Sequence, residues 1–161
     1  MDAIDRAVSQ WGKERPDLNT TPMAMIGRLM RLSKILEGRI AEVHKKYDLK
    51  MGEFDVLATL RRAGAPYRLT PSELLSSMLL TSGAMTNRLD KLESKNLILR
   101  QHSQADRRSI EVELTEDGLA LVEALVTEHV KAQEELVVGL SKAEQQQIGQ
   151  CLKLWLKIFE D

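Results

Sequence analysis

The chain has 161 residues, of which 43% are hydrophobic and 29% charged, and its formal net charge at pH 7 is −1. This length and apolar content fit one domain with a hydrophobic core, and no apolar run approaches the roughly 18 residues of a membrane span. A single cysteine, Cys151, excludes a disulfide framework and a multi-cysteine zinc site. The N-terminus lacks the basic and apolar blocks of a signal peptide, so we expect a cytoplasmic protein. The three histidines lie far apart in sequence and form no ligand cluster, so we expect no metal, and we expect no cofactor.

The near-neutral total conceals an uneven charge distribution. Residues 81–110 carry six basic and three acidic side chains, whereas residues 111–161 carry four basic and eleven acidic ones. A basic middle can bind nucleic acid while an acidic tail stays away from phosphate. Chance clustering on solvated helices is the alternative explanation.

The N-terminal part of the chain is patterned as helices. Residues 2–12 place apolar side chains, Trp11 among them, at helical spacing, and a polar linker follows. Thr21, placed as the N-cap, precedes an apolar stripe that predicts a long helix over residues 21–46. A shorter helix is expected from Met51 to about Ala63.

Two short helices joined by a tight connection are expected over residues 70–95. Thr70 and Glu73 have the spacing of a capping box, with a proline at the first helical position, and this begins the first of the two helices. The second helix has its apolar residues at Met85, Leu89 and Leu92. Such a pair is a helix-turn-helix.

The hydrophobic period then changes from that of a helix to that of a strand. Alternating side chains predict strands at residues 97–100 and 109–114, joined by a polar loop, so residues 97–114 would form a β-hairpin wing. Residues 116–161 return to helical patterning. Together with residues 21–46, they would form the dimerisation helices.

The expected fold class is mainly α with a small β-hairpin, an α+β winged helix-turn-helix with long N- and C-terminal helices. Residues 1–20 would form a helical extension and linker, and residues 21–161 the winged domain. The terminal helices are too apolar for a monomer, which favours a two-fold homodimer. Burial of these helices within one chain is the alternative.

The second helix of a helix-turn-helix fits the major groove of B-DNA, and an arginine at a wing tip can enter the minor groove. Polar residues off the apolar stripe would therefore face double-stranded DNA, and Asp106 could orient a neighbouring guanidinium. A solvated helix face and an ordinary charged turn are the plain alternatives. The candidate DNA-contacting residues are Ser72, Thr81, Ser82, Thr86, Asn87, Arg88, Lys91, Asp106, Arg107 and Arg108.

These motifs resemble the MarR family of bacterial transcriptional regulators. The similarity rests on residues 69–74, residues 82–92, the wing sequence Asp-Arg-Arg-Ser at 106–109 and Leu-Thr-Glu-Asp-Gly at 114–118. It covers residues 22–161. It implies a homodimer that binds a palindromic operator and represses genes until a small phenolic or aromatic anion binds.

A narrower resemblance points to the urate-responsive branch of that family. The matching features are Trp11 on the N-terminal helix, Asp55 and Arg62 seven residues apart, and Arg100 at the base of the wing. By that resemblance, Arg62 or Arg100 would hold the anion and Trp11 would pack on the planar ligand. Asp55 would repel the anion or hydrogen-bond to it.

The chemistry of these residues agrees with such a ligand. Asp55 and Arg62 would lie two turns apart near one side of a helix, and Asp55, set between two apolar residues, would be partly buried and need a partner. Urate is a flat monoanion, which guanidinium groups and an aromatic face can bind. A structural Asp–Arg ion pair, with Trp11 in a dimer core, is the alternative.

The sequence gives less support to other functional classes. A glycine-rich phosphate loop, a nucleophile elbow and a metal-spaced cluster are all missing from it, so we expect no enzyme and assign no catalytic residue. A redox sensor of the same fold is a rival, but Cys151 precedes the apolar Leu152 and is expected to be buried and inert. An adaptor that does not bind DNA would leave Arg107 and Arg108 without a role.

Overall fold

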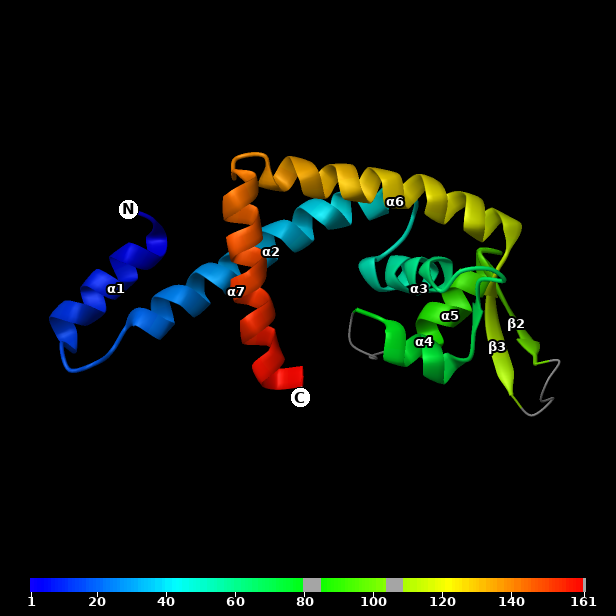
Figure 1. Cartoon of the computed structure of the whole chain (residues 1–161), viewed down its shortest axis with the longest axis horizontal. Helices are drawn as coiled ribbons and strands as arrows, with labels where there is room; N and C mark the ends of the chain where they lie inside the picture. Colours follow the sequence, from blue (N-terminus) through cyan, green and yellow to red (C-terminus); the bar gives the residue numbers. More distant parts are fainter. Residues whose placement is uncertain (80–84, 104–108, 161) are drawn as a thin grey trace. The chain divides into compact units, whose positions relative to one another are not determined.

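The computed structural model describes residues 1–79, 85–103 and 109–160, and these ranges form helices α1 to α7 and strands β1 to β3 (Figure 1). They fall into two compact units, residues 1–40 and 41–161. The boundary lies within a long helix, and the division expected after residue 20 stays a prediction. Among the helices of the described ranges, none is long and apolar enough to cross a lipid bilayer.

The first unit contains α1 (Ala3–Glu14) and most of α2 (Thr21–Lys45). The Asp2 carboxylate caps α1 by accepting the backbone N–H of Asp5 at 2.8 Å. Arg28 of α2 pairs with Asp2, at 2.8 Å, and with Asp5. The N-terminal extension is therefore held to α2 by ion pairs.

The N-cap of α2 differs by one residue from the expected position. The carbonyl of Thr20 accepts the N–H of Ala24 at 3.0 Å, which makes Thr20 the cap and Thr21 the first helical residue. The N–H of Thr21 is satisfied instead by the Asn19 side chain at 3.1 Å. The cap is Thr20 and not the expected Thr21, because the side chain of Asn19, two residues before Thr21, accepts the N–H of Thr21.

The second unit holds the helix-turn-helix and the wing. Helices α3 to α6 pack around one core, with α3 in contact with α4, α5 and α6. Their bounds are α3 Met51–Arg62, α4 Pro71–Ser77, α5 Met85–Ser94, α6 Glu116–Val137 and α7 Lys142–Glu160. Leu57, Leu60, Leu74 and Leu92 are fully buried in this core.

The wing belongs to a three-stranded antiparallel sheet of order β1-β3-β2. The predicted hairpin is confirmed as β2 (Ile98–His102) and β3 (Ile110–Leu114), with Arg100 opposite Val112. The third strand, β1 (Arg68–Leu69), was not expected, because two residues carry no period. It exists because it pairs with β3, more than 40 residues later, with Arg68 opposite Glu113.

Side-chain caps begin α4, α6 and α7, and the cap of α4 is the one that the spacing of Thr70 and Glu73 predicts. Thr70 accepts the N–H of Glu73 to start α4, and Thr115 accepts that of Gly118 at 2.9 Å to start α6. Ser141 and Glu144 cap α7 reciprocally. These caps fix where each of the three helices begins.

Candidate nucleic-acid interface and ligand site

The burial of α5 separates the side chains that hold the helix from those that can face DNA. Leu89 and Leu92 are buried and Met85 packs against the core, as their spacing predicts. The candidate residues Thr86, Asn87 and Lys91 are exposed and Arg88 is half-buried. Three or four residues per turn place these polar side chains off the buried stripe.

Ser72 lies in the first turn of α4 and is exposed. Just before it, the N–H and hydroxyl of Thr70 donate to the Glu73 carboxylate at 2.9 and 2.8 Å, and these bonds lower the pKa of Glu73. The start of α4 is therefore fixed rather than frayed. The candidates Thr81, Ser82, Asp106, Arg107 and Arg108 lie outside the described residues, so their contacts with DNA stay predictions.

Asp55 and Arg62 are brought together as expected from their spacing. Asp55 is 5% exposed, and its Oδ1 lies 4.0 Å from the Arg62 guanidinium. The same oxygen accepts the backbone N–H of Leu79 at 3.5 Å, and Arg62 donates to the carbonyl of Ser77. Both side chains therefore connect α3 to the end of α4.

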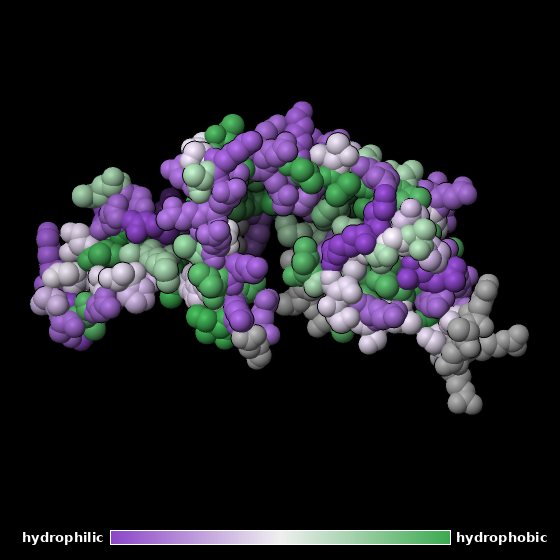
Figure 2. Space-filling model, in the orientation of Figure 1, coloured by the Kyte–Doolittle hydropathy of each residue, from purple (hydrophilic) through white to green (hydrophobic). Residues whose placement is uncertain are grey.

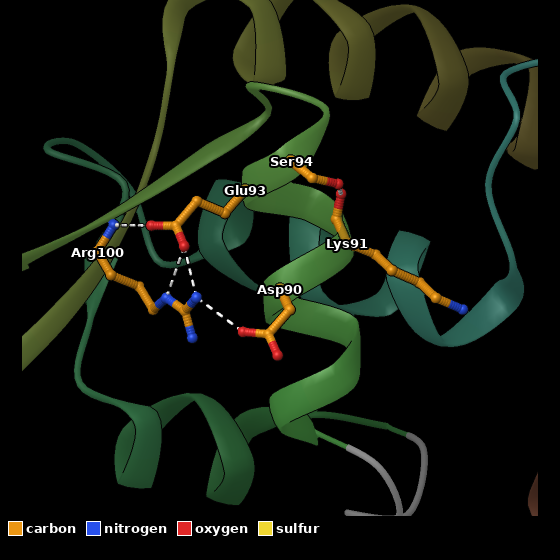
Figure 3. A network of polar contacts seen from close by, with 5 residues as sticks. All are labelled: Asp90, Lys91, Glu93, Ser94 and Arg100. Carbon is orange, nitrogen blue, oxygen red and sulfur yellow. Dashed lines mark hydrogen bonds and ion pairs between the residues drawn. The ribbon is translucent and has the colours of Figure 1, made fainter.

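Arg100 forms a different set of side-chain contacts, to Asp90 and Glu93 of α5 (Figure 3). Its guanidinium donates to Asp90 at 2.7 Å and, through Nε, to Glu93 at 3.0 Å, while its backbone N–H donates to Glu93 at 3.2 Å. Hydrogen bonding to Arg100 lowers the pKa of Glu93, and the two carboxylates raise the pKa of Arg100. Arg100 thus joins β2 to the second half of α5. No local pattern in the sequence marks Asp90 and Glu93 as its partners.

The fourth candidate ligand residue, Trp11, belongs to the first unit, whereas Asp55, Arg62 and Arg100 belong to the second. The Trp11 side chain is 43% exposed. An indole with that much free surface can pack on a planar ligand or on a partner helix.

Cys151 corrects one expectation from the sequence. It is exposed on α7 rather than buried, because α7 buries none of its residues within this chain. Over the ranges described, no three His, Cys, Asp or Glu side chains are grouped so as to hold a metal ion.

Comparison with known proteins decides the family. A model of the MarR family matches residues 49–110. The HTH-type transcriptional regulator PecS of Dickeya dadantii is 40% identical over 141 residues, which is 88% of this chain and 85% of that protein. The chain belongs to the MarR family.

Solved structures of MarR-type proteins share its fold. A mutant of Escherichia coli MarR complexed with operator DNA is 27% identical, with a TM-score of 0.70 over 91% of this chain and 97% of that one. BpsR of Bordetella bronchiseptica, whose DNA binding is regulated by 6-hydroxynicotinic acid, is 24% identical, with a TM-score of 0.71 over 84% and 92%.

Membership of the MarR family makes the chain a DNA-binding transcriptional regulator with a winged helix. In that fold α4 and α5 are the helix-turn-helix and α5 is its second helix. The relatives named are regulators of transcription and not enzymes. The residues around α5 therefore become the candidate interface with DNA.

Proposed function

We propose that this MarR-family regulator is a homodimeric, cytoplasmic repressor that leaves its palindromic operator when urate or a similar aromatic anion binds. In this proposal α5 enters the major groove and the wing enters the minor groove. The proposed ligand-binding residues are Trp11, Asp55, Arg62 and Arg100. The proposed DNA contacts are Ser72, Thr81, Ser82, Thr86, Asn87, Arg88, Lys91, Asp106, Arg107 and Arg108.

The observation that carries the proposal is where the candidate ligand residues make their contacts. Asp55 and Arg62 hold the backbone of Leu79 and Ser77, just before the connection to α5. Arg100 holds the second half of α5 through Asp90 and Glu93. A ligand that draws these side chains away would loosen α5 at both ends.

Charge would make the ligand bind with different affinity to the DNA-binding state and to the released state of the protein. An anion beside Arg62 would compete with the Ser77 carbonyl for the guanidinium, and it would be repelled by the buried Asp55 carboxylate nearby. Both effects favour a state in which α3 and α4 have separated slightly. A ligand shifts an equilibrium only by such a difference, and 1–3 kcal/mol is roughly the size found for coupled sites.

The relatives support an aromatic acid as the class of ligand. The fold shared with BpsR accommodates regulation of DNA binding by 6-hydroxynicotinic acid in that protein. Like urate, that compound combines a planar ring with an acidic group. An exposed guanidinium at Arg62 and an exposed indole at Trp11 are the groups that such a ligand would use.

Exposed apolar side chains support the proposed dimer. On α7, Ile148, Leu152, Leu156 and Phe159 recur at helical spacing and are 43–75% exposed. Figure 2 shows hydrophobic side chains on the surface along the C-terminal half of this helix. A second copy is the partner that would cover such a face on a two-fold axis.

Isothermal titration of the whole protein with urate, xanthine and salicylate tests the ligand. We expect heat of binding with at least one purine, and a large loss of affinity in Arg62→Ala. Arg61→Ala is the matched control, because Arg61 directly precedes Arg62 in α3 but pairs with Glu123. Absence of heat with every purine would contradict a urate-type ligand.

Oxidation remains the alternative signal because Cys151 is exposed. A Cys151→Ser variant separates the two signals. Under our proposal it releases DNA in urate as the wild type does, and a thiol oxidant has no effect on either protein. Release by the oxidant alone, lost in Cys151→Ser, would favour the redox sensor.

A further inference from the structure

We propose that a basic groove between the start of α3 and α5 seats phosphates of the DNA backbone, which adds Lys45 and Lys50 to the DNA interface. This inference rests on the proposed contact of α5 with DNA. Neither lysine was singled out by the sequence, since both lie around the α2–α3 connection, outside the helix-turn-helix.

The basic groove consists of two adjoining cavities of about 650 and 350 Å³. Both are lined by Lys50, Met51, Glu53 and Lys91, so one continues into the other. The smaller cavity reaches Asn87 and Arg88 of α5, and the larger extends to the end of α2. The basic residues that line the groove are Lys45, Lys50, Arg88, Lys91 and Lys95.

The acidic residues of the groove do not balance these cations. Asp48 and Glu53 lie 3.1 and 3.7 Å from the Lys95 ammonium, and Glu53 also accepts the backbone N–H of Lys50 at 3.0 Å. Within the described part of the chain, Lys45, Lys50 and Lys91 form no ion pair. Positive charge is thus left over at Lys45, Lys50 and Lys91.

The first turn of α3 is shaped to receive a side chain from α5. A Cβ at Gly52 would lie 2.5 Å from the Nε and 2.7 Å from the Cζ of Arg88. The Arg88 guanidinium therefore lies directly over Gly52, against the first turn of α3 and at the inner end of the groove. The candidate DNA contact Arg88 and the lysines beyond it therefore share one surface.

The charges of α5 are divided between two sides of the helix. Asp90 and Glu93 face Arg100, whereas Lys91 extends from the opposite side, away from that network (Figure 3). The acidic residues are thus occupied by the wing. On the side that borders the groove, α5 contributes the basic residues Arg88 and Lys91, and Lys95 follows directly after the helix.

A row of cations fits the DNA backbone better than it fits a planar ligand. None of the residues that line the two cavities is aromatic, so a flat ring would find no face to pack on. Phosphates recur along a strand beside the major groove, and lysine is the usual partner that positions a protein on them. Asn87 and Arg88 at one end would read bases while Lys45 and Lys50 contact phosphate.

The salt dependence of DNA binding tests this inference. In the full-length protein, log affinity falls as log salt concentration rises. Lys45→Gln/Lys50→Gln should make this slope less steep by about two, one for each lost phosphate contact. The affinity should fall by the same factor for the operator and for an unrelated duplex, because phosphates carry no sequence. Melting temperature and oligomeric mass should match the wild type.

A matched control is Lys46→Gln/Lys131→Gln, which removes the same charge outside the groove. Lys46 pairs with Glu128 at 3.4 Å, and Lys131 lines a separate cavity beside it. This control should keep the wild-type slope.

Three results would overturn the groove as a DNA site while the wild type still binds its operator. These are an unchanged slope in Lys45→Gln/Lys50→Gln, a loss confined to the operator, and lost urate binding with DNA affinity intact. The last would assign the groove to a small anion. A wild type that binds no duplex would overturn the proposed function and this inference with it.

Discussion

At the scale of single residues, Gly118 shows how closely the wing and α6 pack. A Cβ at this position would lie 1.9 Å from the backbone oxygen of Leu97 and 2.8 Å from its carbonyl carbon. Backbone atoms between α5 and β2 cannot move aside as a flexible side chain can. The glycine of the Leu-Thr-Glu-Asp-Gly motif is therefore required by contact and not by its dihedral angles.

We predict that Gly118→Ala destabilises the protein by about 1–3 kcal/mol, as overpacking does. For a chain of this size each kcal/mol lowers the melting temperature by about 2–4 °C. The control is Gly38→Ala, because a Cβ at Gly38 in α2 meets no atom within 4 Å. Gly38→Ala should leave the melting temperature unchanged or raise it slightly. Equal stability of Gly118→Ala and the wild type would contradict this reading of the motif.

At the scale of elements, three rings join α2, α3 and α6. His44 Nε2 lies 3.0 Å from His129 Nδ1, and the Phe54 ring is 4.4 Å from His44 and 4.6 Å from His129 between centroids. His44 is fully buried, and among the described residues its Nδ1 has no hydrogen-bond partner. Burial lowers the pKa of His44 to about 4, with a contribution from His129, and lowers that of His129.

The folded protein favours the neutral form of both histidines. Below about pH 6.5, the unfolded chain therefore binds more protons than the folded protein does. The free energy of unfolding should therefore fall as the pH decreases from about 6.5 to about 4, and His44 alone accounts for about 3 kcal/mol of this loss. We predict that His44→Leu/His129→Leu flattens the fall in denaturant titrations at fixed protein concentration. The exposed His102→Gln serves as the control and should keep the wild-type slope. A double variant that retains the full slope would show that other groups cause it.

Local patterns predicted most elements, and long-range contacts account for what they missed. The hydrophobic period and the capping residues indicated α2 to α7 and the hairpin, because both signals act over a few residues. Leu89 and Leu92 lie three residues apart on the buried stripe of α5, and Thr115 caps α6 by accepting the N–H of Gly118, three residues later. The strand β1 depends on a pairing 45 residues away, between Arg68 and Glu113, and no local signal marks it.

The candidate site was predictable to the same extent. The seven-residue spacing of Asp55 and Arg62 placed them together, since both are on α3. The partners of Arg100 and the proximity of Lys50 to Lys91 arise only when α5 packs beside β2 and α3. The spacing of these residues along the chain does not predict those contacts.

At the scale of the whole molecule, the proposed dimer explains why α7 buries nothing within one chain. We predict that the wild type has about twice the 18.2 kDa mass of the chain in sedimentation equilibrium. Leu152→Glu/Leu156→Glu should shift the mass toward the monomer, because two charges would enter an apolar interface. Lys157→Glu, on the opposite side of α7, should remain dimeric. A wild-type monomer at micromolar concentration would contradict this arrangement.

The most direct test of a ligand-controlled regulator is the affinity for its own operator with and without ligand. Fluorescence anisotropy of a labelled operator duplex gives the dissociation constant in buffer, in urate and in acetate of equal ionic strength. We predict that saturating urate raises that constant by about five- to a hundredfold, which corresponds to about 1–3 kcal/mol of coupling, and that acetate does not. An unchanged dissociation constant at urate concentrations that saturate the protein in calorimetry would contradict it.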